Sequence, residues 1–255
     1  MKYLEIVKQT YEQWNEKGYC EEAALLNDKI GKQYFDTASP HFFTGDINAE
    51  IVLVHLNPKR ASENFCGRNT FCDFNEYLSH HVNFGKLHYG ENSLRKHKSP
   101  FDHKQVRFLK PFDTLPFKEN DKYHNLEIVV DKKLQIELIP FGSPDFNYNI
   151  IGTNNIKPFI ERILILLFSH ERKYIIFCGK VFIELLKPYL IKQKVHTFKL
   201  TKKNGVLTID DFDVINIQIK FEGKIINAAI APQFAKQGYP VSQYGEMVKN
   251  LYNNF

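Results

Sequence analysis

The sequence predicts an α/β fold in three layers, with helices on both faces of a central, mainly parallel four-stranded sheet. Four runs rich in apolar, β-forming residues are spaced along the chain, at 51–54, 134–139, 173–179 and 224–230. Helical patterns alternate with these runs, which is typical of a parallel sheet covered by helices. Each run also ends abruptly at proline, glycine or polar residues, as strands do at the ligand-binding edge of such a sheet.

The composition is that of a globular protein, because 43% of the 255 residues are hydrophobic and 25% are charged. This length fits one large domain or two small ones, and we expect a single domain over residues 1–255. No apolar run approaches the roughly 20 residues of a membrane span, and the N-terminus lacks the apolar core of a signal peptide. Four scattered cysteines are typical of a reducing compartment. We therefore expect a cytoplasmic protein that binds no membrane, while the oligomeric state stays open.

The first 45 residues are expected to form a helical layer. Apolar side chains recur at helical spacing from Tyr3 to Trp14, and Gly18 should end that helix. A second short helix is expected over Glu21–Lys29, and residues 31–49 should connect it to the first strand.

The first buried strand is expected to end at Asn57-Pro58. Proline cannot donate to a β-ladder and restricts the residue before it, so the chain must turn here. Asn57 would then lie at the carboxyl edge of the sheet, where its carboxamide offers both a donor and an acceptor to water or to a polar substrate edge. Asn57 can equally cap the next turn, because Asn-Pro commonly opens one.

Residues 59–125 are expected to form a long, basic and aromatic insertion. They hold few apolar runs and most of the histidines, with one short helix pattern at Asp73–Leu78. A long irregular segment in a compact domain is usually functional or mobile. The basic residues from Lys86 to Lys110 are explained as well by a solvated charged surface. The net charge of +5 permits an anionic partner without requiring one.

The second strand, Leu134–Ile139, leads into the loop from Pro140 to Pro144. An apolar helix should follow, capped by Asn154 or Asn155 and running to about Ser169. The third strand then ends at Gly179-Lys180, which opens a short helix over Val181–Leu186.

A strand-rich meander is expected over Val195–Leu200, Val206–Ile209 and Val214–Lys220, with Asn204-Gly205 as its hairpin signal. The last strand, Lys224–Ile230, ends in Ala231-Pro232-Gln233, and a helix beginning at Ser242 closes the chain. The four strand ends should meet at one edge of the sheet, which places a site there.

Other constellations are weaker. Cys66 and Cys72 fit no common zinc framework with the nearby histidines, so we expect no metal and no cofactor. Gly179-Lys180 is not a P-loop, and no nucleophile elbow or dinucleotide-binding fingerprint is present. Phe65, Phe71 and Phe74 follow the Asn57 turn and are able either to stack on a flat ring or to form the core of the insertion.

In the order of these motifs the chain resembles the uracil-DNA glycosylase superfamily over roughly residues 45–255. His55-Leu56-Asn57-Pro58 is similar to the family's first motif, and Glu137 to Pro144 to its pocket segment. Cys178-Gly179-Lys180 resembles a later strand end, and Ala231-Pro232-Gln233-Phe234 stands where the family's second motif often carries His-Pro-Ser-Pro. The resemblance implies a uracil-DNA glycosylase-like fold and a protein that recognises a nucleobase in DNA.

The resemblance also implies roles for residues. Asn57 would be the catalytic group that orients water against the sugar, and Phe71 or Phe65 would stack on the flipped base. The remaining pocket contacts would come from His55, Pro58, Pro140, Phe141, Gly142, Ser143, Gly179, Lys180 and Gln233. DNA would be held by Lys59, Arg60, Arg68, Lys236 and Gln237. Ala231 replaces the family's histidine, so no imidazole stands there to stabilise the leaving base.

Three functions stay open from the sequence. The first is hydrolysis of the N-glycosidic bond of a damaged or deaminated base in DNA. The second is nucleic-acid binding without chemistry, which predicts salt-dependent DNA affinity. The third is an enzyme that acts on a free nucleotide or nucleobase and ignores DNA.

Overall fold

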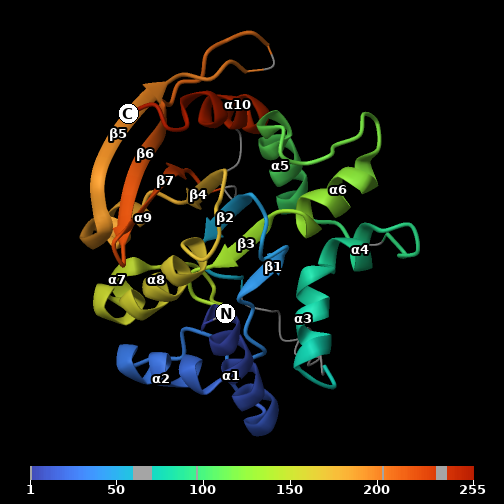
Figure 1. Cartoon of the computed structure of the whole chain (residues 1–255), viewed down its shortest axis with the longest axis vertical. Coiled ribbons are helices and arrows are strands. Elements are labelled where there is room, and N and C mark those ends of the chain that lie inside the picture. The colour runs from blue at the N-terminus through green and yellow to red at the C-terminus, as the bar shows by residue number, and fades with distance from the viewer. Residues whose placement is uncertain (1, 60–70, 96, 203, 234–239) are drawn as a thin grey trace.

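The computed structural model describes residues 2–59, 71–95, 97–202, 204–233 and 240–255, and these form an α/β fold around one mixed sheet (Figure 1). The sheet has seven strands in the order β1-β3-β2-β4-β7-β6-β5. Their bounds are β1 (Phe43–Gly45), β2 (Ile51–His55), β3 (Leu134–Glu137), β4 (Tyr174–Cys178), β5 (Leu190–Phe198), β6 (Phe212–Phe221) and β7 (Lys224–Ala231).

Strand β2 lies near the centre and pairs in parallel with both β3 and β4, and β4 pairs in parallel with β7. Strands β1, β6 and β5 join antiparallel at the two ends of the sheet. The predicted α/β class is confirmed. The sheet has three strands more than the four expected: β1 joins one end, and β6 and β5, from the meander expected as a separate feature, extend it beyond β7.

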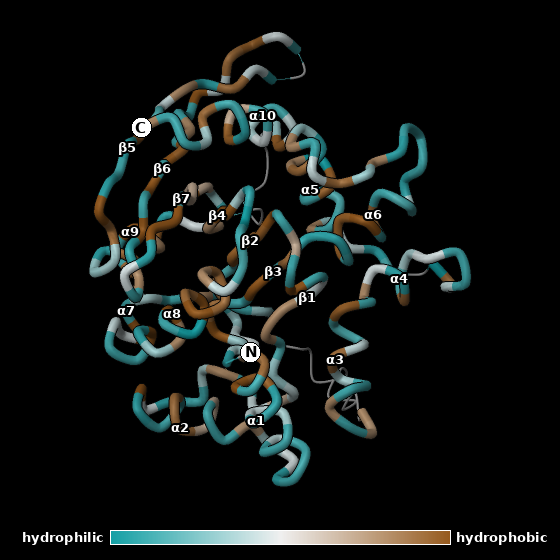
Figure 2. The backbone as a smooth tube through the Cα atoms, viewed as in Figure 1, coloured by the Kyte–Doolittle hydropathy of each residue, from teal (hydrophilic) through white to brown (hydrophobic). Residues whose placement is uncertain are grey.

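Helices cover both faces of the sheet, and the side chains of β2 show why. Val52 and Val54 enter one hydrophobic cluster, while Ile51 and Leu53 enter another on the opposite face. The first cluster is covered by α1 (Lys2–Lys17), α2 (Glu21–Ile30), α3 (Phe74–Val82), α7 (Tyr148–Ile151), α8 (Thr153–Leu167) and α9 (Phe182–Leu186). The second is covered by α4 (Phe84–Tyr89), α5 (Pro100–Leu109), the 3-10 turn Lys110–Phe112, α6 (Lys122–Asp131) and α10 (Val241–Leu251). Hydrophobic residues concentrate in the central strands (Figure 2).

The stretch expected as an irregular insertion, 59–125, is largely helical where the structure describes it, at 71–95 and 97–125. Side chains that accept from backbone N–H groups begin three of its helices: Asp73 caps α3, Ser99 caps α5 and Asp121 caps α6. Helices α5 and α6 then supply much of the apolar cover of the second face. Sequence reasoning anticipated only α3, as the short helix pattern at Asp73–Leu78, and missed α5 and α6, although Ser99 and Asp121 are residue types that commonly cap helices.

The meander also differs from expectation. No strand forms over 206–209, where only an isolated bridge joins Thr201 to Leu207. A turn forms at the expected Asn204-Gly205, where Gly205 has φ of 80° and Lys202 N–H donates to the Val206 carbonyl. A second tight turn, between β6 and β7, lies at Glu222-Gly223, and both residues have positive φ, 47° and 81°. Two consecutive positive φ angles match the twist of a two-residue hairpin.

No helix among the described residues is long and apolar enough to cross a bilayer.

The C-terminal helix α10 packs against α5, and this contact depends on a glycine. A Cβ built on Gly245 would lie 2.1 Å from the carbonyl oxygen of Phe108 on α5. The two backbones therefore approach as closely as they do only because position 245 has no side chain.

We predict that Gly245→Ala destabilises the protein by about 1–3 kcal/mol, since the clash is with backbone and cannot be relieved by a side-chain rotation. In an unhindered helix the same change would stabilise. Unfolding in urea measures the difference. Asn250→Ala, on the exposed side of the same helix, should change the free energy of unfolding by less than about 0.5 kcal/mol. A Gly245→Ala variant as stable as the parent would contradict this account of the contact.

Candidate functional site

The turn after β2, at Asn57-Pro58, is joined to the segment after β3 by backbone hydrogen bonds that continue beyond the ends of both strands. Leu138 N–H donates to His55 O and Ile139 N–H to Leu56 O, each at 2.9 Å. Past the proline, Ser143 N–H donates to Pro58 O at 3.2 Å. The Asn57 corner and the Ser143 loop are thus held side by side at the carboxyl ends of two parallel strands.

The side chain of Asn57 is oriented by three oxygen atoms. Its Nδ2 donates to Ser143 Oγ at 2.7 Å and to the Pro58 carbonyl at 2.9 Å, and lies 3.5 Å from the Phe141 carbonyl. Ser143 Oγ in turn donates to the Asp145 carbonyl, so it can only accept from Asn57. Because the nitrogen must face these acceptors, Oδ1 is left to face elsewhere, and no donor among the described residues reaches it.

A pocket of about 620 Å³ opens beside this corner. Such a volume lies within the range of small-molecule sites. Its lining comes from the ends of β2 and β3, the loop after β3, helix α5 and the segment after β7, namely His41, His55, Leu56, Asn57, Pro58, Lys59, Pro100, Phe101, Lys104, Gln135, Glu137, Ser143, Pro144, Asp145, Phe146 and Gln233. Residues from both the Asn-Pro corner and the Ala-Pro-Gln corner therefore line one cavity, as the site hypothesis requires.

Two phenylalanine rings line the pocket, and neither is one that the sequence singled out. Phe101, in the first turn of α5, packs at an angle on the His55 ring with the centroids 5.1 Å apart. Phe146 lies in the loop after β3. Phe71 is absent from the lining. It contacts Tyr77 and His80 of α3 instead, with centroids 5.5 Å and 5.1 Å away.

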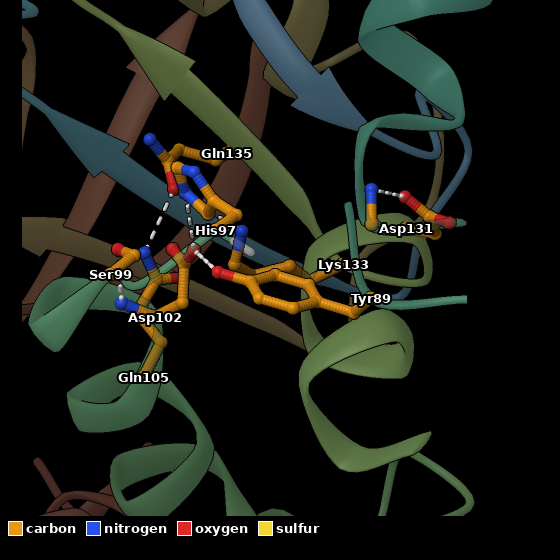
Figure 3. A network of polar contacts seen from close by, with 9 residues as sticks. Tyr89, His97, Ser99, Asp102, Gln105, Asp131, Lys133 and Gln135 are labelled. Carbon is orange, nitrogen blue, oxygen red and sulfur yellow. Dashed lines mark hydrogen bonds and ion pairs between the residues drawn. The ribbon is translucent and has the colours of Figure 1, made fainter. Parts of the chain in front are cut away.

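A polar track crosses the sheet face beneath α5 and ends in the pocket. Lys133 directly precedes β3, and Gln135 and Glu137 lie within it. Because these three residues are spaced by two, their side chains lie on one face of the sheet. Lys133 Nζ donates to Gln135 Oε1 at 3.2 Å, and Gln135 Nε2 donates to Glu137 Oε1 at 2.8 Å. Figure 3 shows Lys133 and Gln135 close to Asp102 and Tyr89, which hydrogen bond to each other at 2.5 Å.

Burial shifts the pKa of each ionisable group of this track toward its neutral form. The carboxyl of Glu137, only 5% exposed, has its pKa raised to about 7 by desolvation. The same cause lowers the pKa of Lys133 to about 8, against the attraction of nearby carboxylates. The pKa of His55 falls to about 3 and that of His41 to about 4, both mainly through burial, so both rings are neutral at pH 7.

A second cavity of about 580 Å³ adjoins the first, and Leu56, Phe146 and Gln233 line both. Gly179 and Lys180 line this second cavity. Gly179 has φ of 147°, a backbone conformation that residues with a side chain rarely adopt, and Gln233 lies beside it. Gly179 N–H donates to Ala231 O, so it is not open to an anion. Lys180 is paired with Asp213 at 2.6 Å.

The remaining expected site residues divide into three groups. Pro140, Phe141 and Gly142 are buried behind the pocket, where the Phe141 ring packs on Phe35 and Phe159. Lys59 is exposed at the pocket margin. Phe65, Arg60, Arg68, Lys236 and Gln237 lie outside the described residues.

Sequence reasoning did not single out Glu137 as a site residue, although a signal was present. In a strand buried on both faces, the pattern Lys133, Gln135, Glu137 places three polar side chains on one face between apolar neighbours. No group of three or more His, Cys, Asp or Glu side chains within the described ranges is arranged to hold a metal ion. Cys66, considered as a metal ligand from the sequence, lies outside those ranges.

A scan against protein-family models found no match, and a search of curated proteins found none either.

We predict that Asn57→Asp is not a conservative change. A carboxylate would face the Pro58 and Phe141 carbonyls without a hydrogen to donate, which should cost about 1–3 kcal/mol. The protonated acid can still donate, so the pKa of this carboxyl should rise on folding and the cost should grow as the pH rises above about 4. Urea unfolding at pH 5 and pH 8 measures the growth. Asn57→Ala serves as the control, since its cost should not depend on pH.

Glu137 should make the parent protein less stable at neutral pH than at pH 4. Its pKa is raised on folding from the usual 4.5 to about 7. The folded state therefore binds this proton more tightly, and stability falls as the pH rises between those values. Relative to the parent, Glu137→Gln should gain roughly 3 kcal/mol between pH 4 and pH 8. Parallel stability curves for the two proteins over that interval would show that Glu137 titrates normally.

Proposed function

We propose that this protein hydrolyses the N-glycosidic bond of a damaged or deaminated nucleobase in DNA, with Asn57 positioning the attacking water. The observation that carries the proposal is the fixed orientation of the Asn57 carboxamide at the pocket. Three oxygens hold its Nδ2, so Oδ1 is presented as a hydrogen-bond acceptor for water. A neutral carboxamide cannot take a proton from the water, but it can orient the lone pair of the water oxygen toward the sugar.

The topology supports the same proposal. Four neighbouring strands, β3-β2-β4-β7, run in parallel, and their carboxyl ends contribute Asn57, Ser143, Gly179 and Gln233 to two adjoining cavities. This is the arrangement that a uracil-DNA glycosylase-like fold would use to collect its motifs. A three-layer architecture with this core is the fold that we propose.

The pocket also suits a flat, polar ring. Its lining combines aromatic faces, Phe101 and Phe146, with hydrogen-bonding groups, Asn57 and Glu137. Base-reading pockets combine stacking surfaces with groups that bond to the base edge. Lys59 and Lys104, which also line the pocket, bring positive charge that would favour a phosphate backbone.

The direct test is base release. End-labelled oligonucleotides containing uracil, hypoxanthine or xanthine, single- and double-stranded, are incubated with the protein and cleaved at abasic sites with alkali. We expect release of at least one of these bases, and we expect Asn57→Ala to lower the rate by about 10²-fold, because water is no longer positioned.

Asn250→Ala, a change of the same kind on the exposed side of α10, should keep the parent rate. If no base is released from any substrate, or if Asn57→Ala works at the parent rate, the proposal fails. If the protein releases bases from free nucleosides but not from oligonucleotides, it hydrolyses the proposed N-glycosidic bond, but DNA is not its substrate.

A further inference from the structure

One carboxyl oxygen at the pocket lacks a partner. Glu137 is about nineteen-twentieths buried and lines the cavity beside Asn57. Its Oε1 accepts from Gln135, but its Oε2 is buried with no hydrogen-bond partner among the described residues. A buried unpaired oxygen of this kind costs stability, which makes it a feature that needs an explanation.

The surrounding hydrogen bonds decide which oxygen of Glu137 carries a proton. Gln105 Nε2 and Lys133 Nζ both donate to Gln135 Oε1, at 2.9 Å and 3.2 Å. Gln135 must therefore turn its NH₂ group toward Glu137 Oε1. Since Oε1 is an acceptor, the proton of the neutral carboxyl lies on Oε2, the oxygen without a partner among the described residues.

We propose that Glu137 is the general acid of the reaction, donating its Oε2 proton to the departing base. The inference rests on the proposed function and extends it. The position of Ala231 lacks the imidazole that the family resemblance would place there, and Ala231 is buried in the hydrophobic cluster of the second face. Glu137 supplies from β3 the stabilisation of the leaving group that the end of β7 does not.

The proposed step balances as a hydrolysis. The oxygen of the Asn57-bound water forms a bond to C1′ of the sugar as the C1′–N bond breaks, and the bond's electron pair leaves with the base. Glu137 Oε2 gives its proton to that base, which departs neutral. The water loses one proton to solvent, and Glu137 regains one from solvent for the next turnover.

The charges around Glu137 set the pH at which it can act. Desolvation favours its neutral form, and the Lys133 ammonium opposes this. His55 and His41 line the same pocket as neutral rings, and they are joined there by the charged groups Lys59, Lys104 and Asp145. Asp102 of α5 acts on Lys133, at the other end of the polar track from Glu137.

The test is the pH profile of base release under single turnover. The rate of the parent should fall about tenfold per pH unit above a pKa of about 7, because only the protonated carboxyl can donate. Glu137→Gln keeps the size of the side chain and cannot transfer a proton. It should lower the rate at pH 6 by about 10²-fold or more and abolish this alkaline limb.

Lys133→Met provides a second, independent variant. Without the ammonium the pKa of Glu137 should rise, so the alkaline limb should move to higher pH while Lys132→Met, an exposed neighbour, leaves it in place. If Glu137→Gln keeps the parent's rate and pH profile, or if Lys133→Met leaves the limb where it was, Glu137 is not the acid. Asn57-dependent base release would still stand in that case, whereas absence of release by the parent removes both proposals.

Discussion

The structure depends on the parallel pairing of β2 with β3 and on its continuation past the strand ends. Backbone hydrogen bonds from Leu138 and Ile139, and finally from Ser143, keep two loops in register beyond the last strand residue. Pairing of this kind is cooperative and geometrically narrow, because a slip of one residue would turn every side chain to the other face. In the observed register His55 lies opposite Glu137. The same register brings Asn57 beside Ser143, so a single alignment places both proposed catalytic groups.

The polar side chains buried beside the pocket, on the second face of the sheet, lower the stability of the fold. A lysine, two glutamines and a glutamate occupy positions that apolar side chains would fill more favourably, since burying polar groups without full hydrogen bonding is unfavourable. The network of Lys133, Gln135, Gln105 and Glu137 offsets most of that cost by pairing its members. Oε2 of Glu137 and Oε1 of Gln105 stay unpaired within the described residues. Local conflicts with folding rules of this kind are typical of functional sites.

Some features of the site were readable from sequence and others were not. The Asn57-Pro58 corner was readable because proline imposes its own geometry, and the Gln233 corner because a buried strand stops there. The roles of Phe71 and Phe101 could not be predicted from the sequence, because an aromatic residue packs equally well in a core or in a pocket. Phe71 follows the corner in sequence but packs on α3, while Phe101 reaches the pocket from α5, whose start lies more than forty residues beyond the Asn57 corner.

The sequence by itself determined the α/β class, the buried central strands and the points where they stop, since these follow from local hydrophobic pattern and from proline and glycine stereochemistry. Only the tertiary structure decided that β1, β5 and β6 extend the sheet, that α5 and α6 cover its second face, and that Glu137 and Asn57 line one pocket. These are contacts between segments far apart in the chain. Their partners are selected by the summed packing of many side chains and by desolvation, which no local pattern records.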